Sequence, residues 1–187
     1  LGGWTWGATL VAFFISSSAL SHFRQAQKQR LAGEKFEKGG RRDLWQTLAN
    51  GGLGALLALV YGLAGEPLAL LIAFAGVMAT VTADTWATEL GVLSPTPPRM
   101  ITSGRRVAPG TSGGVTALGL GASLAGALLL GLCLVLLYRL EHGVWAFLLL
   151  PAALLGGMVG SLADSLLGAT LPAIYRTASG NETERRT

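Results

Sequence analysis

Three acidic residues in apolar surroundings are the side chains of this sequence best suited to chemistry. Asp84 and Glu89 lie in TADTWATELG, at the end of an apolar run that begins at Pro67, and Asp164 lies in GSLADSLLG. Ionisable side chains are costly inside a membrane span and usually face the bundle interior or a wet cavity. Carboxylate oxygens suit Mg²⁺, which typically takes one or two carboxylates together with substrate phosphates. We therefore predict that Asp84, Glu89 and Asp164 hold Mg²⁺, with Asp84 and Asp164 acting in catalysis.

A structural role is the alternative for each aspartate, because a buried carboxylate can pair with an arginine and lock two helices together. Thr80, Asp84 and Thr88 are spaced by four residues, so in a helix they share one face and form a polar stripe that leads inward. The glycines near Asp164 follow the same spacing, and by themselves they indicate a packing seam.

A glycine-rich segment, PGTSGG, follows the paired arginines Arg105 and Arg106. Glycines let backbone N–H groups approach an anion, and a helix N-terminus favours negative charge. We predict that nucleotide phosphates are bound by these arginines and by Gly110, Thr111, Ser112, Gly113 and Gly114. The alternative is a tight turn in which Thr111 or Ser112 caps the following helix.

A second basic segment, KFEKGGRRDLWQTLANGG, passes from a polar stretch into an apolar one. Paired arginines can donate bidentate hydrogen bonds to a phosphate, so we predict that Arg41 and Arg42 orient an acceptor phosphate and that Asn50 assists in binding it. The alternative is an interfacial anchor, because arginine and tryptophan also suit the headgroup zone of a bilayer.

The elements that must position these residues are membrane helices. The chain has 187 residues, of which 51% are hydrophobic and 13% charged, with a mean hydropathy of +0.52; soluble domains carry about 25% charged residues. A bilayer is crossed by about 20 apolar residues in a helix. We predict an all-α, polytopic transmembrane helical bundle that forms a single integral membrane domain over residues 1–187. The expected spans are 4–20, 44–63, 67–93, 113–138 and 144–171.

Charge asymmetry predicts the orientation of the bundle. Most of the lysines and arginines fall in the loops 21–43 and 94–112 and in the tail 172–187, whereas the other two connections are short. The positive-inside rule places the basic segments in the cytoplasm, so we expect a cell-membrane protein, if prokaryotic, whose site faces the cytoplasm. We expect no signal peptide, no nucleic-acid partner, and a full protein with room for further spans. The glycine seams would also allow a homodimer.

Four segments in this order resemble those of one integral membrane family: GRRDLWQTLANGG, ADTWATELG, PRMITSGRRVAPGTSGGVT and GSLADSLLGATLP. The family includes the plant phytyl-phosphate kinase and was formerly classed as a domain of unknown function. It is distantly similar to CTP-dependent polyprenol and phytol kinases and to CDP-diacylglycerol synthases. The resemblance implies a Mg²⁺-dependent kinase that transfers a phosphoryl group from a nucleoside triphosphate, such as CTP, to an isoprenoid monophosphate of the phytyl or geranylgeranyl type.

The chain departs from the family pattern at Ala83, Ser112 and Arg105–Arg106, where many relatives carry Gly, Asn and Lys. These departures leave the nucleotide open more than the class of enzyme. Two alternatives remain: a lipid cytidylyltransferase with the same donor and metal, and a transporter or channel that uses the same intramembrane acids.

Overall fold

The computed structural model describes residues 3–32, 44–171, 175–176 and 182–183, with side chains for 3–32 and 51–171. These residues form the helices α1 (Gly3–His22), α2 (Gln25–Ala32), α3 (Leu44–Leu63), α4 (Leu68–Gly91), α5 (Ala117–His142) and α6 (Leu149–Thr170). Two short antiparallel strand pairs accompany them: β1 (Arg99–Met100) with β2 (Gly114–Val115), and β3 (Tyr175–Arg176) with β4 (Glu182–Thr183). The predicted all-α bundle is confirmed.

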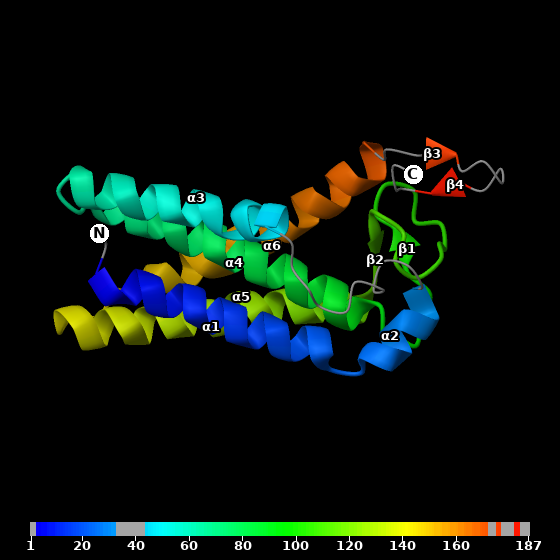
Figure 1. Cartoon of the computed structure of the whole chain (residues 1–187), viewed down its shortest axis with the longest axis horizontal. Coiled ribbons are helices and arrows are strands. Elements are labelled where there is room, and N and C mark those ends of the chain that lie inside the picture. Colours follow the sequence, from blue (N-terminus) through cyan, green and yellow to red (C-terminus); the bar gives the residue numbers. More distant parts are fainter. Residues whose placement is uncertain (1–2, 33–43, 172–174, 177–181, 184–187) are drawn as a thin grey trace.

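The five long helices α1, α3, α4, α5 and α6 correspond to the five predicted spans, and they run side by side along the bundle (Figure 1). In the described part of the chain, α4, α5 and α6 are each long and apolar enough to cross a membrane. Helix α1 meets the same criterion together with α2, from which it is bent by 69°, and α3 is apolar over Gly51–Leu63. We call the end that carries β1 and β2 the hairpin end, and the opposite end, where a tight turn joins α3 to α4, the turn end.

Helix α4 is the centre of the bundle and packs most closely against α6 and α5, with α3 and α1 also in contact. Leu71, Phe74 and Met78 on α4 are almost entirely buried. Trp6 of α1 lies between two other helices, with ring centroids 4.8 Å from Tyr61 of α3 and 4.1 Å from Phe74. These aromatic contacts join α1, α3 and α4 in the half of the bundle nearer the turn end.

Glycines bring α4 and α6 into backbone contact. A Cβ atom added to Gly156 would lie 2.6 Å from the Cα atom of Gly76, and one added to Gly160 would overlap the side chain of Thr80. The Thr80 hydroxyl donates hydrogen bonds to the carbonyl oxygens of Gly76 (2.9 Å) and Gly156 (2.8 Å). Small residues are expected where helices pack this closely in lipid, so the predicted packing seam along α6 is confirmed at Gly156 and Gly160.

The start of the helix after the glycine-rich segment differs from the prediction. Helix α5 begins at Ala117, and residues 114–115 form strand β2, which pairs with β1. Thr116 caps α5, because its hydroxyl oxygen accepts a hydrogen bond from Gly119 N at 3.0 Å. The Thr111 hydroxyl instead donates to Ala108 O. The prediction of a helix N-terminus at the glycine-rich segment is therefore wrong, because residues 114–115 pair with β1 and α5 begins only after them.

Substitution of Gly156 by alanine should destabilise the bundle, whereas Gly121→Ala should not. The added methyl group on Gly156 would meet the backbone of Gly76, and overpacking of this kind costs about 1–3 kcal/mol. Gly121, on α5, has no atom within 4 Å of the equivalent position, and alanine is the better helix former by about 1 kcal/mol. Thermal unfolding in detergent should show a lowered Tm for Gly156→Ala alone; equal Tm values for the two variants would contradict the close packing of α4 on α6.

Candidate functional site

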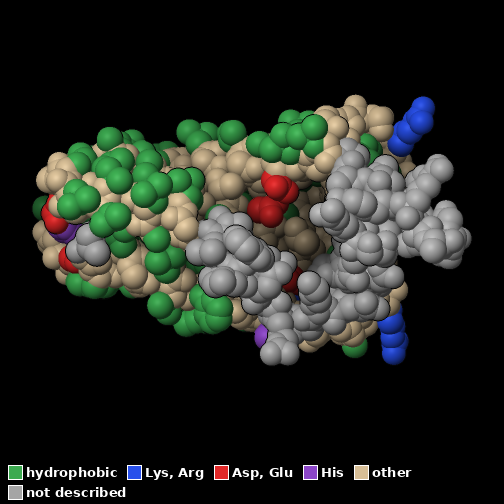
Figure 2. Space-filling view, turned by 45° about the horizontal axis from the view of Figure 1, so that its top comes forward, with side chains coloured by type: hydrophobic (Ala, Val, Ile, Leu, Met, Phe, Trp, Pro, Cys, Tyr) green, Lys and Arg blue, Asp and Glu red, His purple; other side chains and the backbone are tan. Residues whose placement is uncertain are grey.

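The centre of the candidate site is a pair of carboxyl groups, Asp84 on α4 and Asp164 on α6. The two side chains interact directly, through repulsion between their charges and through a side-chain hydrogen bond when one of them holds a proton. Asp84 is partly buried and Asp164 is exposed. Figure 2 shows acidic side chains at a hollow in the middle of the molecule. The predicted proximity of Asp84 and Asp164 is therefore seen, and the Asp164 side of the pair is exposed.

The register between the two helices explains why these carboxyl groups meet. Gly76 lies against Gly156, Thr80 lies against Gly160, and Asp84 lies beside Asp164. Each step is four residues on both helices, which is about one helical turn. Because the glycine contacts hold the two backbones together in this register, the next turn brings the two carboxyl groups to the same level.

A buried pair of hydroxyl groups lies directly behind the aspartates. Ser123 of α5 and Ser161 of α6 are hydrogen bonded at 3.1 Å, and the Ser123 hydroxyl is 3.3 Å from Ala83 O on α4. Both serines are buried. They join α4, α5 and α6 close to the aspartates, because Ala83 precedes Asp84 on α4 and Ser161 lies three residues before Asp164 on α6. Ser123 is missed by the sequence analysis, where its only signal is an isolated hydroxyl in a Gly/Ala-rich helix.

An internal resemblance between α4 and α6 is also missed by the sequence analysis. GVMATVTADT, Gly76–Thr85, and GGMVGSLADS, Gly156–Ser165, share Gly, Met, Ala and Asp at the same positions and end in Thr and Ser. The alignment of the two strings is the same as the register in which the helices pack. The two aspartates are thus equivalent residues of two similar helices that run in the same direction.

The glycine-rich segment docks on α6 one turn beyond Asp164. Gly113 has a φ of +76°, and a Cβ atom there would lie 2.7 Å from the Cα atom of Ala169. A Cβ atom on Gly168 would in turn lie 3.2 Å from Gly113 N. Segment and helix can therefore pack only because both positions lack a side chain. The structure thus brings the predicted phosphate-binding segment to the same end of α6 as the carboxyl pair.

The N–H groups of this segment are not all available for an anion. Thr111 N donates to Ala108 O at 3.2 Å, and Gly114 N donates to Thr111 O at 3.0 Å. A phosphate would therefore have to use other N–H groups among the five predicted residues. Gly110, with a φ of +83°, and Gly113 have the unusual backbone conformation that forms anion-binding concavities.

Arg105 and Arg106 lie on the exposed side of the hairpin. Met100 N donates to Arg105 O at 2.8 Å, and Arg106 forms an isolated bridge with Arg99, so their backbone is fixed while their side chains are exposed. In Figure 2 the visible basic side chains lie at the outer edge of the molecule, away from the hollow with the acidic side chains. A cradle formed by these arginines around a phosphate at the carboxyl pair stays a prediction.

Glu89 does not join the two aspartates. Its carboxylate pairs with Lys28 of α2 and accepts a hydrogen bond from the Ser21 hydroxyl at 2.7 Å. Five residues separate Glu89 from Asp84, so the two side chains point from different faces of α4. Among the described residues no group of three His, Cys, Asp or Glu side chains could hold a metal ion. The structure therefore does not bring Glu89 to the aspartates, and a metal site at Asp84 and Asp164 stays a prediction.

Mg²⁺ still fits the pair of aspartates. Two carboxyl groups held face to face repel each other when both are ionised, and a cation between them would remove that repulsion. Oxygen ligands from two residues, with an open side for substrate phosphates, are the usual protein contribution to a Mg²⁺ site. The predicted residues Arg41 and Arg42 lie outside the described residues, and Asn50 is described by its backbone in α3 only.

The chain belongs to the integral membrane family DUF92, whose model matches residues 1–187. It is 36% identical over 189 residues to Protein PGR of Arabidopsis thaliana, an alignment that covers 90% of this chain and 65% of that protein. It is also 36% identical over 162 residues to an uncharacterized membrane protein of Methanocaldococcus jannaschii, covering 86% of this chain and 62% of that one. The chain thus spans somewhat less than two thirds of the length of these relatives. No solved structure matches it.

Substitution of Gly113 by alanine should detach the glycine-rich segment from α6, and Gly104→Ala is the matched control. Both glycines have positive φ, +76° and +67°, so both substitutions strain the backbone. Only Gly113 also faces Ala169; Gly104 has no neighbour within 4 Å. Trypsin should therefore cleave at the exposed Arg105 and Arg106 much faster in Gly113→Ala than in Gly104→Ala. Equal cleavage rates would show that docking on α6 does not hold the segment.

Proposed function

We propose that this membrane protein is a Mg²⁺-dependent phosphotransferase that adds a phosphoryl group from a nucleoside triphosphate to an isoprenoid monophosphate. The observation that carries the proposal is the carboxyl pair of Asp84 and Asp164, held together by packed glycines and exposed on the Asp164 side. Two neighbouring acids without a basic partner among the described residues are expensive in a membrane helix bundle, and such residues usually mark a functional site. The resemblance of the four sequence segments to the phytyl-phosphate kinase family indicates the reaction.

In the proposed mechanism, Asp84 and Asp164 would hold Mg²⁺ together with the nucleotide phosphates. When bound, the metal would neutralise charge on those phosphates. Gly110 and Gly113 would offer backbone N–H groups to the donor, and Arg41, Arg42 and Asn50 would orient the acceptor. Phosphoryl transfer depends mainly on positioning and on charge neutralisation, so a bundle with two carboxylates and a glycine-rich segment has the groups that the reaction needs.

The bond changes require no further reactant. An oxygen of the acceptor monophosphate forms a bond to the γ-phosphorus of the donor, while the bond between that phosphorus and the β–γ bridging oxygen breaks. The products are an isoprenoid diphosphate and a nucleoside diphosphate. Because a phosphate monoester already carries a nucleophilic oxyanion, the acceptor needs no general base such as a histidine. His142 ends α5 at the turn end of the bundle, and His22 ends α1 next to Ser21, whose hydroxyl contacts Glu89 rather than Asp84.

The distribution of polar residues on α4 and α6 argues against a transport path between these two helices. From the aspartates toward the turn end, α4 contains only apolar residues over 68–74, and α6 contains only apolar residues and a proline over 149–155. A pathway for protons or cations would need polar groups on both sides of the membrane. Asp84, Asp164 and the glycine-rich segment lie instead toward the hairpin end. We propose that this end faces the cytoplasm, where a soluble nucleotide could reach them.

Asp84→Asn should reduce phosphoryl transfer by at least about 10²-fold, the loss typical when one preorganised electrostatic group is removed. Asp164→Asn should also reduce it. Glu66→Gln, which changes an exposed acid in the turn between α3 and α4, should leave the rate unchanged. The assay is transfer from labelled CTP or ATP to phytyl or geranylgeranyl phosphate by purified protein, with and without Mg²⁺.

The labelled product identifies the class of enzyme. A lipid diphosphate carrying the γ-label supports the kinase, and a lipid carrying CMP would show a cytidylyltransferase instead. Full activity of Asp84→Asn would remove the aspartate pair from the mechanism, and activity in the presence of a chelator would remove the metal.

A further inference from the structure

Helices α1 and α2 are joined by a sharp bend, which we call the elbow, and one side chain of α2 is buried. The chain bends by 69° between the two helices, and Arg24 at the bend has a φ of +50°, a conformation that non-glycine residues rarely adopt. All eight residues of α2 are described, and only Lys28 among them is buried. Helix α2 is polar and makes few contacts with other elements, and Lys28 is the residue by which it reaches the buried interior.

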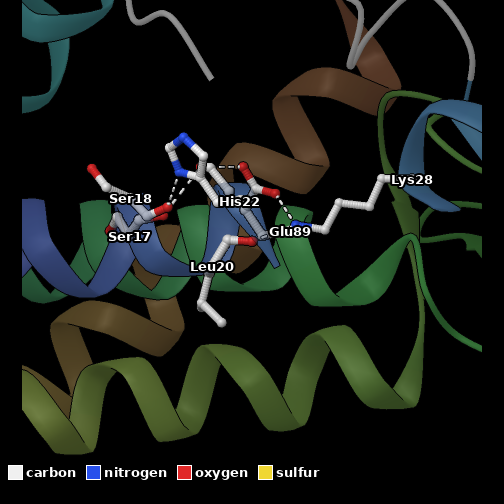
Figure 3. Close-up of polar contacts among 7 residues, drawn as sticks. Ser17, Ser18, Leu20, His22, Lys28 and Glu89 are labelled. Carbon is white, nitrogen blue, oxygen red and sulfur yellow. Dashed lines mark hydrogen bonds and ion pairs between the residues drawn. The ribbon is translucent and has the colours of Figure 1, made fainter. Parts of the chain in front are cut away.

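The Lys28 ammonium group reaches across from α2 to the end of α4. It pairs with Glu89 and donates a hydrogen bond to Leu20 O, a carbonyl near the end of α1 (Figure 3). The second carboxylate oxygen of Glu89 accepts from the Ser21 hydroxyl at 2.7 Å. The exposed fraction is 0% for the Lys28 side chain and 14% for that of Glu89. A charge buried to this degree is tolerated only when paired and hydrogen bonded, and here the described partners come from α1, α2 and α4.

A buried ion pair responds to the loss of one partner differently from an apolar contact. Removal of one member of a buried ion pair leaves the other charge without compensation, whereas removal of both members is often far less harmful. The pair therefore behaves as an all-or-none attachment for α2. Glu89 is five residues beyond Asp84 on α4, so the attachment is made to the same helix that carries the site. Figure 1 shows α2 at the hairpin end of the bundle.

We propose that Lys28 and Glu89 are positioning residues that form a latch, which fixes α2 against the end of α4 and so holds in place the end of the helix that carries Asp84. The kinetic part of this inference rests on the proposed function, and the structural part does not. With the latch closed, α2 has one position at the hairpin end. With either charge removed, α2 swings at the elbow and the end of α4 beyond Asp84 loses this support.

Distance measurements test the latch without reference to activity. In a Cys133→Ala background, spin labels are attached at Gln27 on α2 and at Leu118 on α5, both exposed. The latch predicts one narrow distance distribution for the parent and a broad one for Lys28→Met and for Glu89→Gln. Arg30→Met is the matched control, because it removes a neighbouring but exposed positive charge from the same helix, and its distribution should stay narrow.

A double-mutant cycle and kinetics complete the test. The Lys28→Met/Glu89→Gln double variant should be no less stable than either single variant, because neither charge is left buried alone. Each single variant should lower kcat/KM for phosphoryl transfer by about 10- to 100-fold, the effect of misplaced binding groups, when assayed well below its Tm. A structural role alone would lower Tm and leave kcat/KM unchanged.

The outcomes separate the latch from the proposed function. Narrow distances in both single variants would overturn the latch, and broad distances with unchanged kcat/KM would overturn its positioning role. If the parent transfers no phosphoryl group, the proposed function fails, and the distance distributions alone still support or overturn the latch.

Discussion

The candidate site depends on the backbone contact between α4 and α6. Gly76 against Gly156 and Thr80 against Gly160 leave no space between the helices, and the Thr80 hydroxyl bonds to a carbonyl oxygen on each of them. Lipid offers no hydrophobic driving force between helices, so close packing and interhelical hydrogen bonds must hold them together. One turn further on, the same register forces Asp84 and Asp164 to face each other. The repulsion between two carboxylates is therefore imposed by contacts that are themselves favourable.

The two acids of TADTWATELG, Asp84 and Glu89, have very different surroundings although they lie on the same helix. Glu89 is fully provided with partners, since Lys28 and Ser21 occupy both of its carboxylate oxygens. Asp84 has no basic partner among the described residues, and its neighbour is another aspartate. A stabilising role accounts for Glu89 without any ligand. It does not account for Asp84, because a structure selected only for stability would not place two carboxyl groups together in a membrane. The contrast within ten residues is the strongest support for our proposal that the aspartate pair binds a cation.

The sequence predicts the bundle and the aspartates well, and the contacts of the loops poorly. Membrane spans are predictable because their length follows from bilayer thickness, and the convergence of polar residues at one end follows from the alternation of helix direction. The attachment of Glu89 to Lys28 is not predictable, because it requires the elbow at Arg24 to bring a distant helix back. The docking of Gly113 on Ala169 likewise depends on a strand pair that has no pattern of its own in the sequence. The resemblance between the strings around Asp84 and Asp164 was available in the sequence, and it would have predicted both the pairing and the register.

That resemblance also shows where the site is asymmetric, and the asymmetry indicates how a ligand enters. At the turn after each aspartate, α4 carries Thr88 and α6 carries Gly168. Gly168 lies against the glycine-rich segment, so α6 is covered at this level, whereas Thr88 remains exposed. Two similar helices thus offer equivalent carboxylates but different surroundings. A cation can be shared equally by the pair, whereas two phosphates bound to it would meet a backbone-lined wall on the α6 side and an open, hydroxyl-bearing face on the α4 side. Separate binding places for a phosphate donor and a phosphate acceptor can therefore arise from two similar helices, because Gly168 allows the glycine-rich segment to pack against α6.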